Sequence, residues 1–91
     1  MLVLPATLTE QQAQACLASL LPAVRATGGA TVAIHAAALQ QFDSSALAVL
    51  LECRREAARA GKTLRVDAMP PRLQTLAGLY GVADLLSETA P

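Results

Sequence analysis

The sequence has few aromatic residues and no excess of charge of either sign. Phe and Tyr occur once each and Trp is absent, so the chain lacks the aromatic platforms on which single-stranded nucleic acids stack. Seven Lys and Arg residues balance seven Asp and Glu residues. A neutral chain creates no positive field to attract nucleic acid or an anionic membrane. We therefore expect no nucleic-acid partner.

Long hydrophobic runs are absent too, although hydrophobic residues make up 54% of the chain and the mean hydropathy is +0.43. The clearest uninterrupted apolar run is residues 46–51, whereas spanning a bilayer takes about 20 apolar residues. The N-terminus has no basic segment before an apolar one, which predicts no signal peptide. We therefore expect a cytoplasmic protein without direct membrane insertion, and the apolar content argues against intrinsic disorder.

Cysteine and histidine are scarce. Cys16, Cys53 and His35 are the only residues of these two types, and their spacing matches no metal-binding pattern. Both cysteines fall at apolar helical positions, which predicts packed thiols rather than a disulfide or a metal site. Gly28 and Gly29 lie in no phosphate-binding motif. We expect neither a metal nor another cofactor.

The 91 residues fit one domain, residues 1–91, in which strand and helix patterns alternate. Such alternation predicts an α/β fold, with a small, mostly parallel sheet covered by three to four helices. Pro22 predicts a kink in the first helix, unless that helix ends before it, because proline lacks a backbone donor. In chain order we expect a strand at 1–4, a helix that starts after Thr7 or Thr9 and ends before Gly28, a strand at 31–35, a connection at 36–42, a helix from 43–45 to 60, a strand at 63–66, a helix between Pro70 and Gly81, and a last turn at 82–86.

The helix predicted after residue 43 has a wide apolar face. Its opposite face carries Glu52, Arg55, Glu56 and Arg59 at spacings that pair opposite charges, which predicts a solvated surface. An apolar arc this wide either lies in the core or extends to a partner, and the spacing leaves both open. The arc consists of a stripe, Ala46, Val49, Leu50, Cys53, Ala57 and Ala60, widened on one side by Leu47, Leu51 and Ala58.

The start of this helix has its own chemistry. Asp43, Ser44 and Ser45 lie where unpaired backbone N–H groups and the positive end of the helix dipole converge. A phosphoryl group on Ser44, or a carboxylate or phosphate of a partner, would be stabilised there. The alternative is that a serine simply caps the helix.

The last long helix is predicted to place Leu73, Leu76 and Leu79 on one face. Tyr80 follows directly, and we expect its ring to anchor this helix against the body of the domain. Its hydroxyl would remain at the surface.

Residues 42–51, Phe-Asp-Ser-Ser-Ala-Leu-Ala-Val-Leu-Leu, resemble the Asp-Ser/Thr-Ser/Thr/Gly-Gly-Leu segment of STAS domains (sulfate transporter and anti-sigma factor antagonist). The resemblance extends through the preceding strand, residues 61–64 and residues 76–81, so that it covers most of the chain. The small size and the Leu-Ala-x-Leu-Tyr ending are most similar to the MlaB-like group, the STAS subunits of the bacterial Mla phospholipid-transport ABC systems.

This resemblance implies a single STAS-like α/β domain that is not an enzyme. It implies binding to the MlaF-like ATPase subunit of an ABC transporter, within a complex with a membrane permease that maintains outer-membrane lipid asymmetry. The chain would then be cytoplasmic, held peripherally at the inner membrane by its partner. The alternative within the family is an anti-sigma factor antagonist that an anti-sigma factor kinase switches by phosphorylating Ser44.

Ser44 falls on the family's functional Ser/Thr position, and the resemblance makes it the candidate phosphorylation site. The sequence departs from the family pattern in three ways. Ala46 replaces the usual Gly, where its methyl would meet a partner or kinase, and His35 replaces an Asp that many members carry. The first strand of the family's opening hairpin is also expected to be missing. The predicted partner-binding surface is Asp43, Ser44, Ser45, Ala46 and Leu47, extended by Leu51, Arg54 and Arg55.

A hydrolytic set of Ser44, His35 and Asp43 is the remaining enzymatic hypothesis. Adjacent Asp43 and Ser44 cannot readily place His35 between them, and the sequence has no G-x-S-x-G elbow. We therefore expect no catalytic residues.

Overall fold

A computed structural model describes residues 2–86 of the chain. Strand and helix alternate as predicted, and the α/β class is confirmed. No helix within 2–86 is long and apolar enough to cross a membrane. The elements are β1 (Leu2–Val3), β2 (Thr7–Leu8), α1 (Glu10–Ala26), β3 (Thr31–His35), β4 (Gln41–Phe42), α2 (Ser44–Arg59), β5 (Thr63–Asp67), α3 (Pro71–Leu79) and α4 (Ala83–Leu86).

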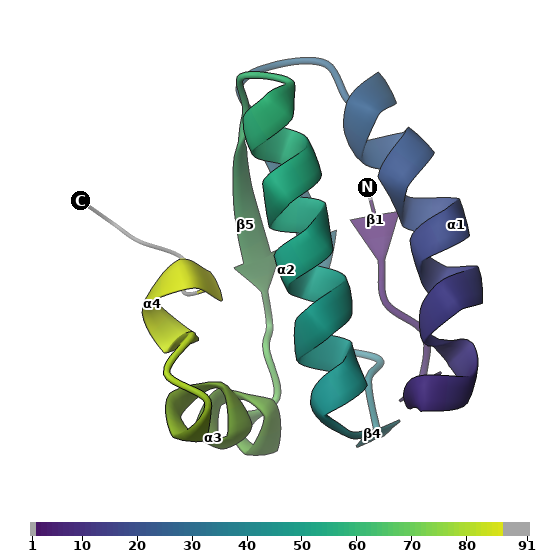
Figure 1. Cartoon of the computed structure of the whole chain (residues 1–91), viewed down its shortest axis with the longest axis vertical. Helices are drawn as coiled ribbons and strands as arrows, with labels where there is room; N and C mark the ends of the chain where they lie inside the picture. The colour runs from purple at the N-terminus through teal and green to yellow at the C-terminus, as the bar shows by residue number, and fades with distance from the viewer. Residues whose placement is uncertain (1, 87–91) are drawn as a thin grey trace.

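The main sheet has the strand order β1-β3-β5, and both pairings are parallel. Leu2, Ile34 and Val66 lie opposite one another across it. Figure 1 shows α1 and α2 side by side over one face of this sheet, with α3 and α4 beside the end of β5. Ile34 and Val32 are fully buried under these helices, because alternate strand residues point to the same face.

The described part of the molecule is flat, measuring 31 × 30 × 19 Å, because its two long helices lie on one side of the sheet. On the uncovered side His35 lies across from Val3 and Asp67 in the strand register. Asp67 pairs with Arg65 two residues before it, at 2.8 Å from Nε to Oδ1. Among residues 2–86, β1 forms one edge of the sheet and no antiparallel strand pairs with it.

A second, two-stranded sheet was not predicted. β2 and β4 pair in parallel, with Leu8 opposite Phe42, and Ala6 O accepts the N–H groups of Gln40 and Gln41. The expectation that 36–42 is only a connection is therefore wrong at its end. Two-residue strands are too short to show a period in the sequence. Their pairing brings the start of α1 beside the start of α2.

Both ends of α1 are closed by side chains. Thr9 is the N-cap, and its N–H donates to Gln12 Oε1 at 3.0 Å, so the second of the two predicted starts is confirmed. The helix continues past Pro22 rather than ending early. At its other end Lys62 Nζ donates to the carbonyl of Arg25 at 3.2 Å and also to the carbonyls of Val24 and Thr27. Gly61, at φ +73°, makes the turn that positions this lysine.

The cysteines are packed as predicted. Cys53 is fully buried on α2, and burial raises the pKa of its thiol to about 12. Cys16 is half-buried on α1, and burial also raises its pKa. Within the described residues, no cluster of His, Cys, Asp and Glu could hold a metal ion.

Candidate functional site

The Asp43 carboxylate joins the starts of two helices. Its Oδ1 accepts the N–H of Ser45 at 2.8 Å, which caps α2, and its Oδ2 accepts the N–H of Glu10 at 3.3 Å, the first residue of α1. These bonds favour the charged form and lower the pKa of Asp43, the bond from Ser45 contributing most. The side chain is exposed, yet its acceptors serve the chain's own backbone.

Replacing Asp43 with Ala is expected to lower the urea midpoint of unfolding at pH 7, because two helix starts lose an acceptor. The pKa of Asp43 is lower folded than unfolded, so its stabilising effect is complete above the unfolded pKa and is lost as the pH falls through the folded pKa. The gap between wild type and D43A should therefore close in acid. Asp43→Asn, which keeps one acceptor oxygen, should lie between them; a gap that is constant with pH would contradict this role.

The start of α2 offers fewer free donors than predicted. The side chain of Asp43 accepts a hydrogen bond from the N–H of Ser45. The backbone carbonyl of Asp43 accepts one from the N–H of Ala46, at 3.0 Å. The expectation of a row of unsatisfied amide groups is therefore wrong at these two positions. The exposed side chain of Ser44 remains: its hydroxyl has no hydrogen-bond partner within the described chain.

Two residues of the predicted surface are in the core instead. Ala46 is fully buried and Leu47 is 3% exposed, because both lie on the side of α2 that covers the sheet. Leu47 therefore cannot supply the apolar contact expected of it, and the Ala46 methyl does not stand where a partner would approach. Leu51 is partly buried, and Arg54 and Arg55 are exposed.

An open groove of about 590 Å³ lies between the start of α2 and one side of α3, and it is the feature that Ser44 borders. We call it the α2–α3 groove. None of Leu51, Arg54, Arg55 and His35 lines it. Its lining residues are Phe42, Asp43, Ser44, Pro71, Arg72, Thr75, Leu76, Leu79 and Tyr80.

The far end of the groove is formed by two exposed apolar residues. Leu79 is 78% exposed, so it does not share the burial of Leu73, with which it was predicted to share a face. Tyr80 is 60% exposed, so the prediction that its ring anchors α3 against the body of the domain is wrong. The helix buries Leu73 and Ala77, which are one turn apart. Leu79 is two residues beyond Ala77, which turns it by about 200° to the outer side.

Arg72 forms the other end of the groove. Its guanidinium lies 5.2 Å from the centre of the Phe42 ring, within range of a cation–π contact. Sequence reasoning missed Arg72 and Thr75. Their signal was the spacing of Arg72, Thr75, Leu76 and Leu79, which places all four on one side of a helix.

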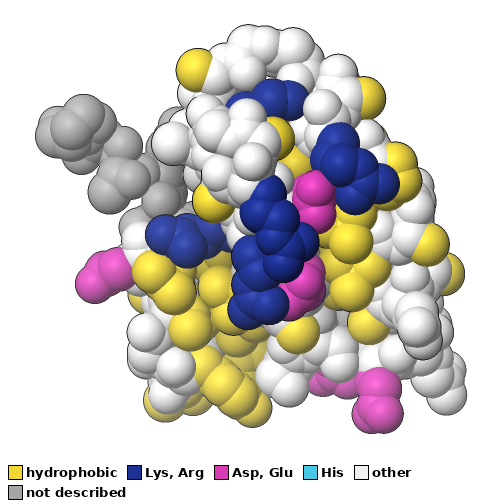
Figure 2. Space-filling model, turned by 45° about the horizontal axis from the view of Figure 1, so that its top comes forward, with side chains coloured by type: hydrophobic (Ala, Val, Ile, Leu, Met, Phe, Trp, Pro, Cys, Tyr) yellow, Lys and Arg dark blue, Asp and Glu magenta, His cyan; other side chains and the backbone are white. Residues whose placement is uncertain are grey.

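The outer face of α2 is charged, and most of its charges are paired. In Figure 2 Lys and Arg side chains gather over α2, with Asp and Glu side chains among them and hydrophobic side chains on either side. The predicted pairs are confirmed: Arg55 Nη1 lies 3.0 Å from Glu52 Oε1, and Arg59 Nη1 lies 3.3 Å from Glu56 Oε1. Arg25 of α1 also pairs with Glu56, at 3.4 Å. These exposed pairs agree with the solvated surface that the spacing predicts.

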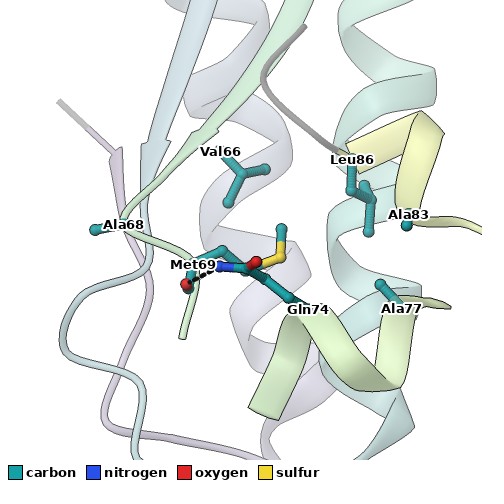
Figure 3. Close-up of a pocket in the computed structure, with 7 residues that line it drawn as sticks. All are labelled: Val66, Ala68, Met69, Gln74, Ala77, Ala83 and Leu86. Carbon is teal, nitrogen blue, oxygen red and sulfur yellow. Dashed lines mark hydrogen bonds between the residues drawn. The ribbon is translucent and has the colours of Figure 1, made fainter. Parts of the chain in front are cut away.

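A second cavity, of about 440 Å³, lies at the end of β5 against α3 and α4 (Figure 3). It shares no lining residue with the α2–α3 groove. Gln74 Nε2 donates to Met69 O at 2.8 Å across it. Ala68, at φ +56°, turns the chain there. Its lining residues are Val66, Ala68, Met69, Gln74, Ala77, Ala83 and Leu86.

Comparison with known families agrees with the topology and with the segment that carries Ser44. A comparison with curated proteins finds no match. The family model described as "Mlab, STAS domain" matches residues 1–87. Because this match covers nearly the whole chain, including both sides of the α2–α3 groove, the chain belongs to the MlaB-like STAS domain family.

Proposed function

We propose that this chain is a non-enzymatic, cytoplasmic interaction subunit that binds the MlaF-like ATPase of a phospholipid-transport ABC complex. It would sit at the inner membrane through that partner, in a complex with the permease, and would support the maintenance of outer-membrane lipid asymmetry. The ATPase would contact the α2–α3 groove and the adjoining hydroxyl of Ser44.

The observation that carries this proposal is the pair of exposed apolar side chains at the end of α3. Leu79 and Tyr80 line the same open groove as Ser44, which is the family's functional Ser/Thr position. A large aromatic residue beside a groove is the kind of residue that dominates binding at protein interfaces. The Ser44 hydroxyl adds a polar contact at the rim, where it can donate or accept a hydrogen bond.

Such a subunit acts by mass action and needs no chemistry of its own. By binding only the folded ATPase, it stabilises that state by RT ln(1 + [L]/Kd). This term is about 2.7 kcal/mol when the free subunit is at one hundred times Kd. Support of assembly and activity would follow from that stabilisation.

Replacing Ser44 with Glu is expected to weaken the complex strongly, because it adds a charged and longer side chain at the rim, beside the carboxylate of Asp43. Ser44→Ala should have a smaller effect, since it removes only the hydroxyl. The measurement is co-purification of each variant with the Mla-type ATPase of the same organism, followed by its ATPase rate. If Ser44→Glu co-purifies as well as wild type does, the assignment of this surface is wrong.

The exposed Ser44 hydroxyl also supports the second candidate, an anti-sigma factor antagonist switched by phosphorylation. A kinase requires an accessible hydroxyl, and Ser44 meets that requirement. Mass spectrometry after incubation with ATP and the organism's anti-sigma factor kinases separates the two functions. Stoichiometric phosphoserine at Ser44 would favour the switch, and an unmodified chain that binds the ATPase would favour the transporter subunit.

A further inference from the structure

The two charged residues that line the α2–α3 groove are in different situations. Asp43 is occupied, because its two carboxylate oxygens accept backbone N–H groups of Ser45 and Glu10. Arg72 is exposed, and its guanidinium makes no ion pair with an acidic side chain among residues 2–86. The N–H donors of the Arg72 guanidinium are therefore available to a ligand at one end of the groove.

The contact with Phe42 places this guanidinium without using its donors. The centre of the ring lies 5.2 Å from the guanidinium carbon, and Phe42, the last residue of β4, is itself half-buried against the core. A guanidinium over an aromatic face keeps its N–H groups at the rim, where they suit the two oxygens of a carboxylate. This end of the groove is thus complementary to a negative charge.

The other end is complementary to an apolar side chain. Leu79 is seven residues after Arg72 on the same helix, and Tyr80 follows it. Seven residues of helix rise about 10 Å, so the backbone positions of Arg72 and Leu79 are separated by about that distance along α3. A ligand that satisfies both ends must carry a carboxylate and an apolar anchor at this spacing.

From this charge complementarity we propose that the groove binds an acidic amphipathic segment of the ATPase, whose carboxylate pairs with Arg72 while an apolar side chain covers Leu79 and Tyr80. In a helix these two side chains would be seven residues apart, and in an extended strand about three. The proposal deepens the function proposed above and rests on it: the partner is the same ATPase, and the new element is the chemistry by which it is recognised.

The test measures Kd between the purified chain and the purified ATPase by isothermal titration calorimetry, at low and at moderate salt. Arg72→Glu is expected to weaken binding by more than tenfold at low salt, and Arg72→Gln by less. Wild-type affinity should fall as salt rises, and that of Arg72→Gln should fall less. The matched control is Arg59→Glu, the same charge reversal on an exposed residue at the opposite end of α2, which should bind like wild type.

A charge exchange makes the test specific. Acidic residues of the ATPase are replaced one at a time by Arg, and one replacement should restore binding to Arg72→Glu while weakening binding to wild type. If wild type binds but Arg72→Glu binds equally well, the carboxylate proposal is wrong and the proposed function stands. If wild type does not bind at all, the proposed function itself is wrong. If Arg72→Glu instead changes the oligomeric state of the chain alone, the groove's occupant is a second copy and the proposal is overturned.

Discussion

Replacing Leu50 with Ala is expected to lower the free energy of unfolding by about 3 kcal/mol. Leu50 is fully buried on α2, the helix that contacts α1, α3, α4 and β5. Truncating it removes apolar contacts on several elements at once and leaves a cavity that helices on both sides cannot fill. Small domains have total stabilities of about 5–15 kcal/mol, so this single change would remove a large part of the total.

The measurement is urea unfolding followed by circular dichroism, with the slope of the transition compared between variants to check that the same two states are present. Leu79→Ala is the matched control, because it makes the same chemical change at a residue that is 78% exposed. It should change the free energy of unfolding by less than about 0.5 kcal/mol. Equal losses in the two variants would contradict the burial of α2 described above.

Truncation at Leu79 should affect binding to the ATPase much more than it affects folding stability. Replacing both Leu79 and Tyr80 with Ala is expected to weaken binding to the ATPase by about thirtyfold or more, since two adjacent apolar side chains would form the centre of the contact. The folding stability should stay near that of wild type, because both side chains are mostly exposed.

Titration calorimetry with the ATPase measures this effect, and urea unfolding of the same preparations shows whether the fold is intact. Leu85→Ala is the control, because Leu85 is also an exposed apolar residue, 43% exposed on α4, and does not line the groove. It should bind as wild type does. If Leu85→Ala weakens binding and the double variant does not, the contact lies on α4 and the groove is not the interface.

The parts of the fold that the sequence predicted are those with long repeats of one period. The sheet-facing side of α2 follows a helical spacing from Ala46 to Ala57, and the strand at Thr31–His35 alternates buried and outward residues. In both, burial of a repeated apolar pattern decides the conformation. The two helix starts were also indicated locally, since Thr9 and Asp43, each among the predicted start residues, cap α1 and α2 through bonds between residues two or three apart.

What could not be predicted depends on contacts between distant segments. β2 and β4 are two residues each and exist because residues 34 positions apart meet in space. The same holds for the bond from Glu10 to Asp43, which no local pattern indicates. The burial of Leu47 and the exposure of Leu79 were decided by which side of each helix packs against its neighbouring elements, and the apolar spacing alone does not reveal that choice.

The carboxylate shared by the two helix starts couples the groove to the rest of the covering layer. Asp43 borders Ser44 on one side and holds the first turn of α1 on the other, so a displacement of this loop is transmitted to a helix that does not line the groove. A partner that docked at Ser44 would therefore contact a loop held by two hydrogen bonds of Asp43, not a free loop end. Because this loop is already ordered in the free chain, binding a partner there would cost little conformational entropy.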